Sequence, residues 1–176
     1  ILGSWAAMRD VETQVPLLLS GTIEPMGSML AGQGIDAFYT SIEHANPLSV
    51  GLNCATGPEF MTDHLRTLSG MARSFVSVYP NAGLPDETGQ YSETPEMMSQ
   101  TLGRFMESGW VNLVGGCCGT TPEYIRQIAA AAQAHKPRQI PSGRLVTHVS
   151  GIDYVEVEED SRPLLIGERT NVIGSR

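Results

Sequence analysis

The chain has 176 residues, enough for one ordinary domain or for parts of two. A hydrophobic fraction of 41% and 19 glycines indicate a packed globular protein and argue against a disordered one. The formal net charge of −8 and the lack of a basic stripe argue against nucleic acid as a partner, because neutralising a phosphate backbone needs clustered lysine and arginine. No apolar run approaches the roughly twenty residues that cross a bilayer, so we expect no membrane contact.

The cysteine count indicates a reducing compartment. Cys54, Cys117 and Cys118 are odd in number and too few for a disulfide framework. The amino terminus also lacks the charged and then apolar pattern of a signal peptide. We therefore expect a soluble cytoplasmic protein with free or metal-bound thiols. The chain begins at Ile1 without a methionine, which predicts a piece of a longer protein.

Short apolar runs and helical patterns alternate along the chain. Residues 1–14 are typical of the end of a helix and its loop. Four apolar runs then recur roughly every thirty residues, the spacing of βα units in a parallel sheet. Because each run is nearly continuously apolar, we expect strands buried on both faces. The predicted strands are residues 16–19, 48–52, 75–79 and 111–114.

A helical pattern follows each predicted strand. The third helix has the clearest ends, with Thr94 as N-cap, Pro95 at the first helical position and Gly109 just past the end. The fourth opens at Thr121 and Pro122. Helical spacing predicts a core-facing stripe on each helix. In chain order, the stripes are Ile35, Phe38, Ile42 and Ala45; Met61, Leu65, Leu68 and Ala72; Met98, Leu102 and Phe105; and Ile125, Ile128, Ala129 and Ala132.

Four βα units make half of an eight-stranded barrel or a small open sheet. We favour an α/β fold of the (β/α)8 TIM barrel type with only the last four units present. Prolines in residues 136–142 predict a linker, and the alternating, acidic segment around Glu156 and Glu158 predicts a solvated strand or loop. The predicted division is a half barrel over 1–135, a linker over 136–162 and the first strand of a second domain over 163–176.

The three cysteines all stand at the ends of predicted strands. Cys54 ends the second strand, whereas Cys117 and Cys118 end the fourth. Because the carboxyl ends of parallel strands lie on one side of a sheet, three thiolates could meet at one point. Zinc favours thiolate ligands, and a catalytic zinc keeps three protein ligands and one open position. Spacing alone leaves two alternatives open, namely small buried cysteines and a vicinal disulfide. The histidines, His44, His64, His135 and His148, share no spacing with the thiols and are predicted to be solvated or structural.

Several motifs resemble one known family. Residues 20–23 (SGTI), 51–55 (GLNCA), 80–85 (PNAGLP) and 115–122 (GGCCGTTP) together resemble the homocysteine-binding barrel of the cobalamin-dependent methionine synthase family. Residues 166–172 (IGERTNV) resemble the opening of that family's pterin-binding barrel, which takes methyltetrahydrofolate. The resemblance runs from about Val15 to the last residue. The GGCCG motif marks homocysteine methyltransferases generally, and the GERTN motif narrows the match to folate-using members.

The resemblance implies a methyltransferase that makes methionine. Cys54, Cys117 and Cys118 would bind zinc, and the homocysteine sulfur would be the fourth ligand, losing its proton to become the nucleophile. The methyl donor would be methylcobalamin, recharged by 5-methyltetrahydrofolate. The pterin, cobalamin and S-adenosylmethionine-using reactivation domains would belong to the same full-length chain. Asn81 falls where the family can place a neutral oxygen ligand, although an asparagine in such a motif is also a common turn residue.

Four further residues are weaker candidates. Asn53 could bind substrate or orient its loop, and Thr22 could line the site. Glu168 and Asn171 resemble cofactor-binding residues of the pterin domain. We expect this chain alone to be inactive, because the groups that grip the amino group of homocysteine would lie in the absent first half. The alternatives are a betaine- or S-methylmethionine-dependent homocysteine methyltransferase without cobalamin, and a non-catalytic structural zinc domain closed by a fourth protein ligand.

Overall fold

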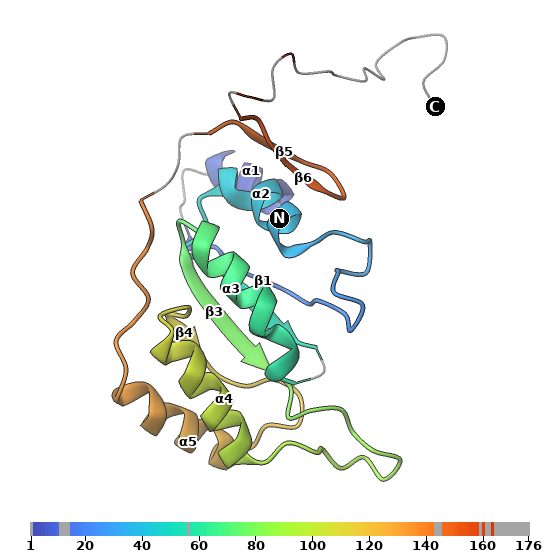
Figure 1. The fold of residues 1–176 in the computed structure, drawn as a ribbon, viewed down its shortest axis with the longest axis vertical. Helices are drawn as coiled ribbons and strands as arrows, with labels where there is room; N and C mark the ends of the chain where they lie inside the picture. Colours follow the sequence, from blue (N-terminus) through green and yellow to red (C-terminus); the bar gives the residue numbers. More distant parts are fainter. Residues whose placement is uncertain are drawn as a thin grey trace.

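A computed structural model describes residues 2–10, 15–55, 57–142, 146–158, 160 and 163 (Figure 1). The helices are α1 Leu2–Asp10, α2 Ile35–Ile42, α3 Thr62–Met71, α4 Pro95–Glu107 and α5 Pro122–Gln133, with short 3-10 turns at η1 Glu43–Ala45 and η2 Glu59–Met61. The strands are β1 Leu18–Gly21, β2 Ser49–Cys54, β3 Phe75–Pro80, β4 Leu113–Val114, β5 His148–Ser150 and β6 Tyr154–Glu156. No helix in these ranges has both the length and the apolar character needed to span a membrane.

Strands β1 to β4 form one parallel sheet in chain order, which confirms the predicted α/β fold with alternating strands and helices. All four strands differ from their predicted bounds: β2 starts one residue later and extends to Cys54, and β3 extends to Pro80. β1 starts at Leu18, two residues later than predicted, and extends to Gly21. β4 contains only Leu113 and Val114. Before them, the Val76 N–H donates to the side-chain oxygen of Asn112 at 2.9 Å and not to a backbone carbonyl, so the regular ladder of backbone hydrogen bonds starts later.

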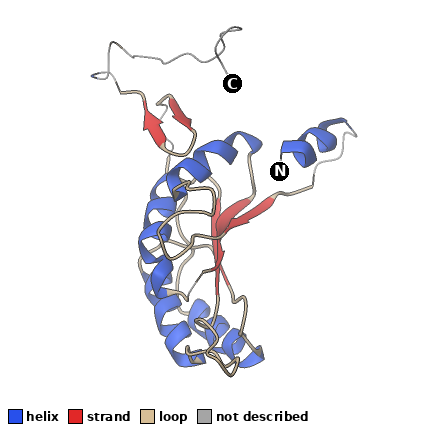
Figure 2. Ribbon diagram, turned by 90° about the vertical axis from the view of Figure 1, so that its right-hand side faces the viewer, coloured by secondary structure: helices blue, strands red, loops and turns tan. Residues whose placement is uncertain are grey.

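Helices α2 to α5 cover one face of the sheet, and α1 lies apart from them (Figure 2). The covered face carries the core residues Val50, Leu52, Val76 and Val78, all 0% exposed. The register places Leu18, Phe75 and Leu113 on the opposite face, where their exposed fractions are 59%, 40% and 37%. The prediction that the strands are buried on both faces is therefore confirmed for the middle of β2 and β3, where Ser49, Gly51 and Ser77 on the second face are also buried. It is wrong at Leu18, Phe75 and Leu113.

Helix α4 has the ends that its sequence predicts. The Thr94 hydroxyl accepts the Met97 N–H at 3.2 Å, and Pro95 occupies the first turn, where an N–H would have no partner. At the other end Gly109 has a φ of +68°, and its N–H and that of Trp110 donate to carbonyls of the last turn. The Trp110 ring stacks on Phe105 with centroids 5.9 Å apart, the apolar contact that accompanies this type of helix end.

The predicted stripe of helix α5 is only partly correct. Tyr124 and Ile128 are buried, whereas Ile125 is 46% exposed and Ala129 is also exposed. Helix α5 packs beside α4, and the Tyr124 hydroxyl donates to the Glu93 carbonyl just before α4. This anchor turns the helix so that the Tyr124 side faces inward, which the spacing of apolar residues alone does not reveal.

The segment predicted as a linker begins with an anchored residue, Arg138. Arg138 is 4% exposed, and its guanidinium donates to the carbonyls of Ser69, Ala72 and Ser74 around the carboxyl end of α3. Burial lowers the pKa of Arg138, while the helix end supplies the negative dipole that favours a cation. Its carbonyl accepts from the Asn112 side chain at 2.9 Å. Arg138 thus ties the chain after α5 to the amino end of the sheet.

A two-stranded hairpin, β5 and β6, follows and packs on α2 (Figure 1). His148 Nε2 lies 3.0 Å from Glu43 Oε2, and Glu43 also pairs with Arg73 at 2.7 Å. A cavity of about 390 Å³ lies between the hairpin and the ends of α2 and α3. Glu158 is exposed as predicted, but Glu156 is half-buried and accepts from the Tyr154 hydroxyl at 2.9 Å. The structural role predicted for His148 is confirmed.

Candidate metal centre

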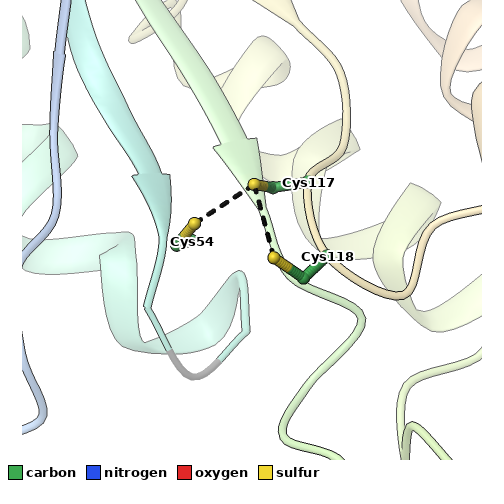
Figure 3. A group of neighbouring side chains, drawn as sticks. All are labelled: Cys54, Cys117 and Cys118. Carbon is green, nitrogen blue, oxygen red and sulfur yellow. Dashed lines mark hydrogen bonds between the residues drawn. The ribbon is translucent and has the colours of Figure 1, made fainter.

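The carboxyl ends of β2 and β4 bring all three cysteines together (Figure 3). Cys54 Sγ lies 3.1 Å from Cys117 Sγ, and Cys117 Sγ lies 3.8 Å from Cys118 Sγ. All three sulfurs fall within 4.8 Å of one another. Cys54 and Cys117 are half-buried and Cys118 is exposed. Residues 63 positions apart in the chain thus share one cluster, as the topology of a parallel sheet predicts.

Cys54 reaches the cluster through an unusual backbone conformation. Simple alternation along β2 would place its side chain on the helix-covered face with Leu52. Instead Cys54 and Ala55 have φ values of 61° and 57°, in the left-handed region. For residues other than glycine this conformation costs about 1–2 kcal/mol each. The backbone is held by the Asn81 N–H, which donates to the Cys54 carbonyl at 3.2 Å.

The Cys117–Cys118 turn is fixed by hydrogen bonds and by two glycines. The Cys117 N–H donates to the Pro80 carbonyl at 2.8 Å, and the Thr120 hydroxyl donates to the Cys117 carbonyl at 2.7 Å. Gly119 has a φ of +78°, and a Cβ there would stand 2.5 Å from the Tyr91 ring. A Cβ on Gly116 would stand equally close to Thr120. The GGCCG motif therefore needs glycine on both sides of the thiols for space and for backbone conformation.

Asn81 lies between the two cysteine loops at the end of β3 and is 8% exposed. Its Nδ2 donates to the Ala55 carbonyl at 2.9 Å, and its Oδ1 accepts the Cys118 N–H at 3.0 Å. Both ends of the amide therefore hold the backbone beside a thiol. The prediction that Asn81 supplies an oxygen ligand stays a prediction. In this geometry the Asn81 side chain holds the backbone of the two cysteine loops together, which we call its holding role.

Asn53 contacts the cluster directly. Its Nδ2 donates to Cys54 Sγ at 3.1 Å, and its Oδ1 accepts from the Ser20 hydroxyl at 2.6 Å. Thr22, two residues after Ser20 and half-exposed, makes no hydrogen bond to the thiols in the described part of the chain. The substrate-binding roles predicted for Asn53 and Thr22 stay predictions. Glu168 and Asn171 lie outside the described residues.

Without a metal the thiols share protons. The hydrogen bond to Cys117 is the main reason that the pKa of Cys54 is raised, to about 11. Burial pushes the pKa of Cys117 upward, but the hydrogen bonds from Cys54 and Cys118 outweigh it and lower that pKa below its ordinary value. As the pH rises, Cys117 therefore loses its proton before Cys54 does. A bound cation would replace the shared proton.

The donor set fits zinc. Four ligands about 2.3 Å from a tetrahedral zinc ion stand about 3.8 Å from one another. The Cys117–Cys118 sulfur distance equals this value, and the 3.1 Å between Cys54 and Cys117 needs only a small opening. Among the His, Cys, Asp and Glu side chains of the described residues, no fourth joins the group. Three thiolate ligands are the number that a catalytic zinc site takes from the protein.

Sequence reasoning found the three thiols but missed two of their neighbours. Ser20 had appeared only as part of a motif, and Ala55 only as the residue after a cysteine. The signal for Ser20 was present, because β1 and β2 are neighbours and Ser20 pairs with Gly51, two residues before Asn53. The role of Ala55 carried no such signal, since it contributes only its backbone carbonyl.

Comparison with known proteins identifies the family. The family model described as homocysteine S-methyltransferase matches residues 3–132 of this chain. The chain belongs to the homocysteine S-methyltransferase family. It is also similar to the crystal structure of the homocysteine methyltransferase MmuM from Escherichia coli in its apo form, with 24% sequence identity and a TM-score of 0.47. That match covers 60% of this chain and 35% of the other, so the chain spans about a third of the length of that enzyme.

Family membership agrees with the site. The matched range contains all three cysteines together with Ser20, Asn53 and Asn81. It confirms the coarser part of the prediction, a methyltransferase domain of the homocysteine type. It ends before residues 166–172, the motif that resembles the folate-using members.

Proposed function

We propose that this chain is the zinc-binding part of an enzyme that transfers a methyl group to the thiol of homocysteine and yields methionine. The observation that carries the proposal is the group of three sulfurs within 4.8 Å at the carboxyl end of a parallel sheet. Active sites of α/β barrels lie at this end. The family supplies the substrate class, and the thiols supply the chemistry.

Each cysteine has a defined part in this mechanism. Zinc, held by Cys54, Cys117 and Cys118, would lower the pKa of the homocysteine thiol and keep its sulfur nucleophilic at neutral pH. Cys54 and Cys117 form the half-buried side of the site, and exposed Cys118 marks the side from which substrate enters. The left-handed backbone at Cys54 and the Asn81 hydrogen bonds hold the sulfurs in place before the metal arrives. Such preorganisation lowers the cost of assembling the site.

The proposed methyl donor is methylcobalamin, recharged by 5-methyltetrahydrofolate, on further domains of a longer methionine synthase chain. The support is the resemblance of residues 166–172 to the start of a pterin-binding barrel, a segment outside the described residues. The alternative is a betaine or S-methylmethionine donor without cobalamin. The family model favours neither, because it ends before the segment that distinguishes them.

The open face of the sheet supports the proposed barrel. Leu18, Phe75 and Leu113 lie exposed on the face opposite the helices. In a (β/α)8 barrel this face is the interior, which is filled by branched and aromatic side chains from all strands. We propose that four further βα units complete the barrel, that residues 136–162 link it to a second domain and that the whole protein is cytoplasmic.

Zinc X-ray absorption of the full-length protein tests the proposal. The metal shell should contain three sulfurs alone and four after homocysteine is added, and methionine, a thioether, should add none. An unchanged shell with homocysteine would instead indicate a closed structural site. Incubating the same protein with methylcobalamin, betaine or S-methylmethionine and measuring methionine identifies the donor. Formation of methionine from betaine alone would contradict the cobalamin assignment.

A further inference from the structure

The strongest unassigned feature is the pair of side chains beside Cys54. The Ser20 hydroxyl donates to Asn53 Oδ1 at 2.6 Å, and Asn53 Nδ2 donates to Cys54 Sγ at 3.1 Å. We propose that Asn53 is a positioning residue for the metal-bound sulfur of Cys54 and that Ser20 holds the Asn53 amide in the required orientation. This inference rests on the proposed zinc site and gives Asn53 a role on the metal ligand itself.

The backbone N–H groups of the Cys117–Cys118 turn bond mainly to oxygen acceptors. The Cys117 N–H donates to the Pro80 carbonyl and the Cys118 N–H to Asn81 Oδ1. The backbone N–H groups of Cys54 and Cys118 also act on the Cys117 sulfur and help to lower its pKa. Among the hydrogen bonds of the described ranges, the N–H that reaches the Cys54 sulfur comes from Asn53. N–H support for Cys54 from this part of the chain therefore depends on Asn53.

The charge of the occupied site makes this support important. Three thiolates around a divalent cation leave one net negative charge, and a bound substrate thiolate adds a second. A hydrogen bond from a neutral N–H to a charged acceptor is stronger than one between neutral groups. Asn53 would therefore take up part of the negative charge and stabilise the metal-bound form of Cys54. Partners of this kind typically change metal affinity by about 10- to 100-fold.

Ser20 matters because an amide can present either end. A metal-bound thiolate only accepts hydrogen bonds, so the NH2 end of Asn53 must face it and the oxygen must face Ser20. The Ser20 hydroxyl then donates to that oxygen, which also polarises the amide and strengthens its N–H as a donor. The adjacent parallel strands β1 and β2 supply the two residues, and their register fixes the separation.

Cobalt substitution of the full-length protein tests the pair. The sulfur-to-cobalt charge-transfer band reports electron density on the ligand sulfurs, and chelator competition reports zinc affinity. Asn53→Leu keeps the volume and removes the donor. It should shift the band to lower energy and weaken zinc binding about 10- to 100-fold. Ser20→Ala should shift the band in the same direction with about a fivefold loss of affinity, the value of one neutral hydrogen bond.

Two further variants make the test specific. Ser20→Thr keeps the hydroxyl and should restore both the band and the affinity. Ser41→Ala removes an exposed hydroxyl that donates to Phe38 at 2.7 Å, on helix α2 away from the thiols, and should change neither readout. If Asn53→Leu does not fold, the charge-transfer band and the zinc affinity of Ser20→Ala and Ser20→Thr test the proposal by themselves.

The outcomes separate this inference from the proposed function. A wild-type band and affinity in the folded Asn53→Leu protein, or in Ser20→Ala, would overturn the role of the pair while the zinc site stands. A wild-type protein that binds neither cobalt nor zinc would overturn the proposed function and this inference together.

Discussion

The two ends of the four-stranded sheet are built for different purposes. At the amino end, Arg138 is 4% exposed and satisfied by three carbonyls, and Asn112 bonds to both Val76 and Arg138. At the carboxyl end, three sulfurs remain half-buried or exposed, and two residues adopt left-handed backbone conformations. At the amino end the polar side chains of Arg138 and Asn112 have hydrogen-bond partners, whereas the carboxyl end keeps its sulfur atoms accessible and accepts strain. This difference is typical of α/β barrels, in which stability and chemistry occupy opposite ends.

The largest expected effect is at the carboxyl end. Cys118→Ser in the full-length protein replaces a thiolate ligand by a hydroxyl, which zinc binds poorly. We expect zinc occupancy to fall and methyl transfer to be abolished, while the thermal unfolding midpoint of the metal-free protein stays unchanged because the Cys118 side chain is exposed. Metal analysis and a methionine assay check this. Normal zinc content and turnover would remove Cys118 from the site.

The next effect should appear at the amino end. Arg138→Met retains much of the volume but leaves buried carbonyls of Ser69, Ala72 and Ser74 without their donor. We expect a loss of about 3 kcal/mol in the free energy of unfolding, measured with urea. Arg126→Ala, which removes an exposed ion pair with Glu123, is the matched control and should cost less than about 1 kcal/mol. A zinc affinity that fell in parallel with stability would mean that the two ends are not independent.

A smaller change would test the link between the cysteine loops. Asn81→Ala removes both hydrogen bonds, to Ala55 and from Cys118, and should weaken zinc binding about tenfold with a loss of about 1–2 kcal/mol in stability. Asn81→Asp keeps the acceptor for the Cys118 N–H and loses the donor to Ala55. If the holding role is the main one, its zinc affinity should lie between wild type and Asn81→Ala. An affinity above wild type would favour the oxygen-ligand role.

The most gradual effect is a dependence of zinc affinity on pH. The pKa of Cys54 is about 11 without metal, so its proton must leave when zinc binds at neutral pH. Affinity should therefore rise with pH, by about tenfold per unit for each proton released, and proton release can be measured in weakly buffered solution. The stability of the metal-free protein should change with pH in the opposite direction to zinc affinity. Because the folded pKa of Cys54 is raised, its contribution to stability is lost as pH rises from about 9 through about 11. A pH-independent zinc affinity would contradict thiolate ligation.

Much of the architecture is readable from the sequence because it depends on local patterns. The βα order and the ends of α4, from Thr94 to Gly109, follow from apolar spacing and capping chemistry. The exposed Ile125 and the buried Arg138 could not be read in this way. The exposure of Ile125 depends on how α5 is anchored to α4. The burial of Arg138 depends on three carbonyl groups that lie 64 to 69 residues away in the chain.

The convergence of the three cysteines was determined by the sequence alone, since parallel strands place their carboxyl ends on one side and the cysteines end two of them. Only the tertiary structure decided how the sulfurs are aimed and supported. The left-handed turn at Cys54, the amide of Asn81 between two loops and the contact of Asn53 with Cys54 and Ser20 all depend on the register and separation of neighbouring strands. Those distances are set by packing across the whole sheet, and short-range sequence patterns carry no information about them.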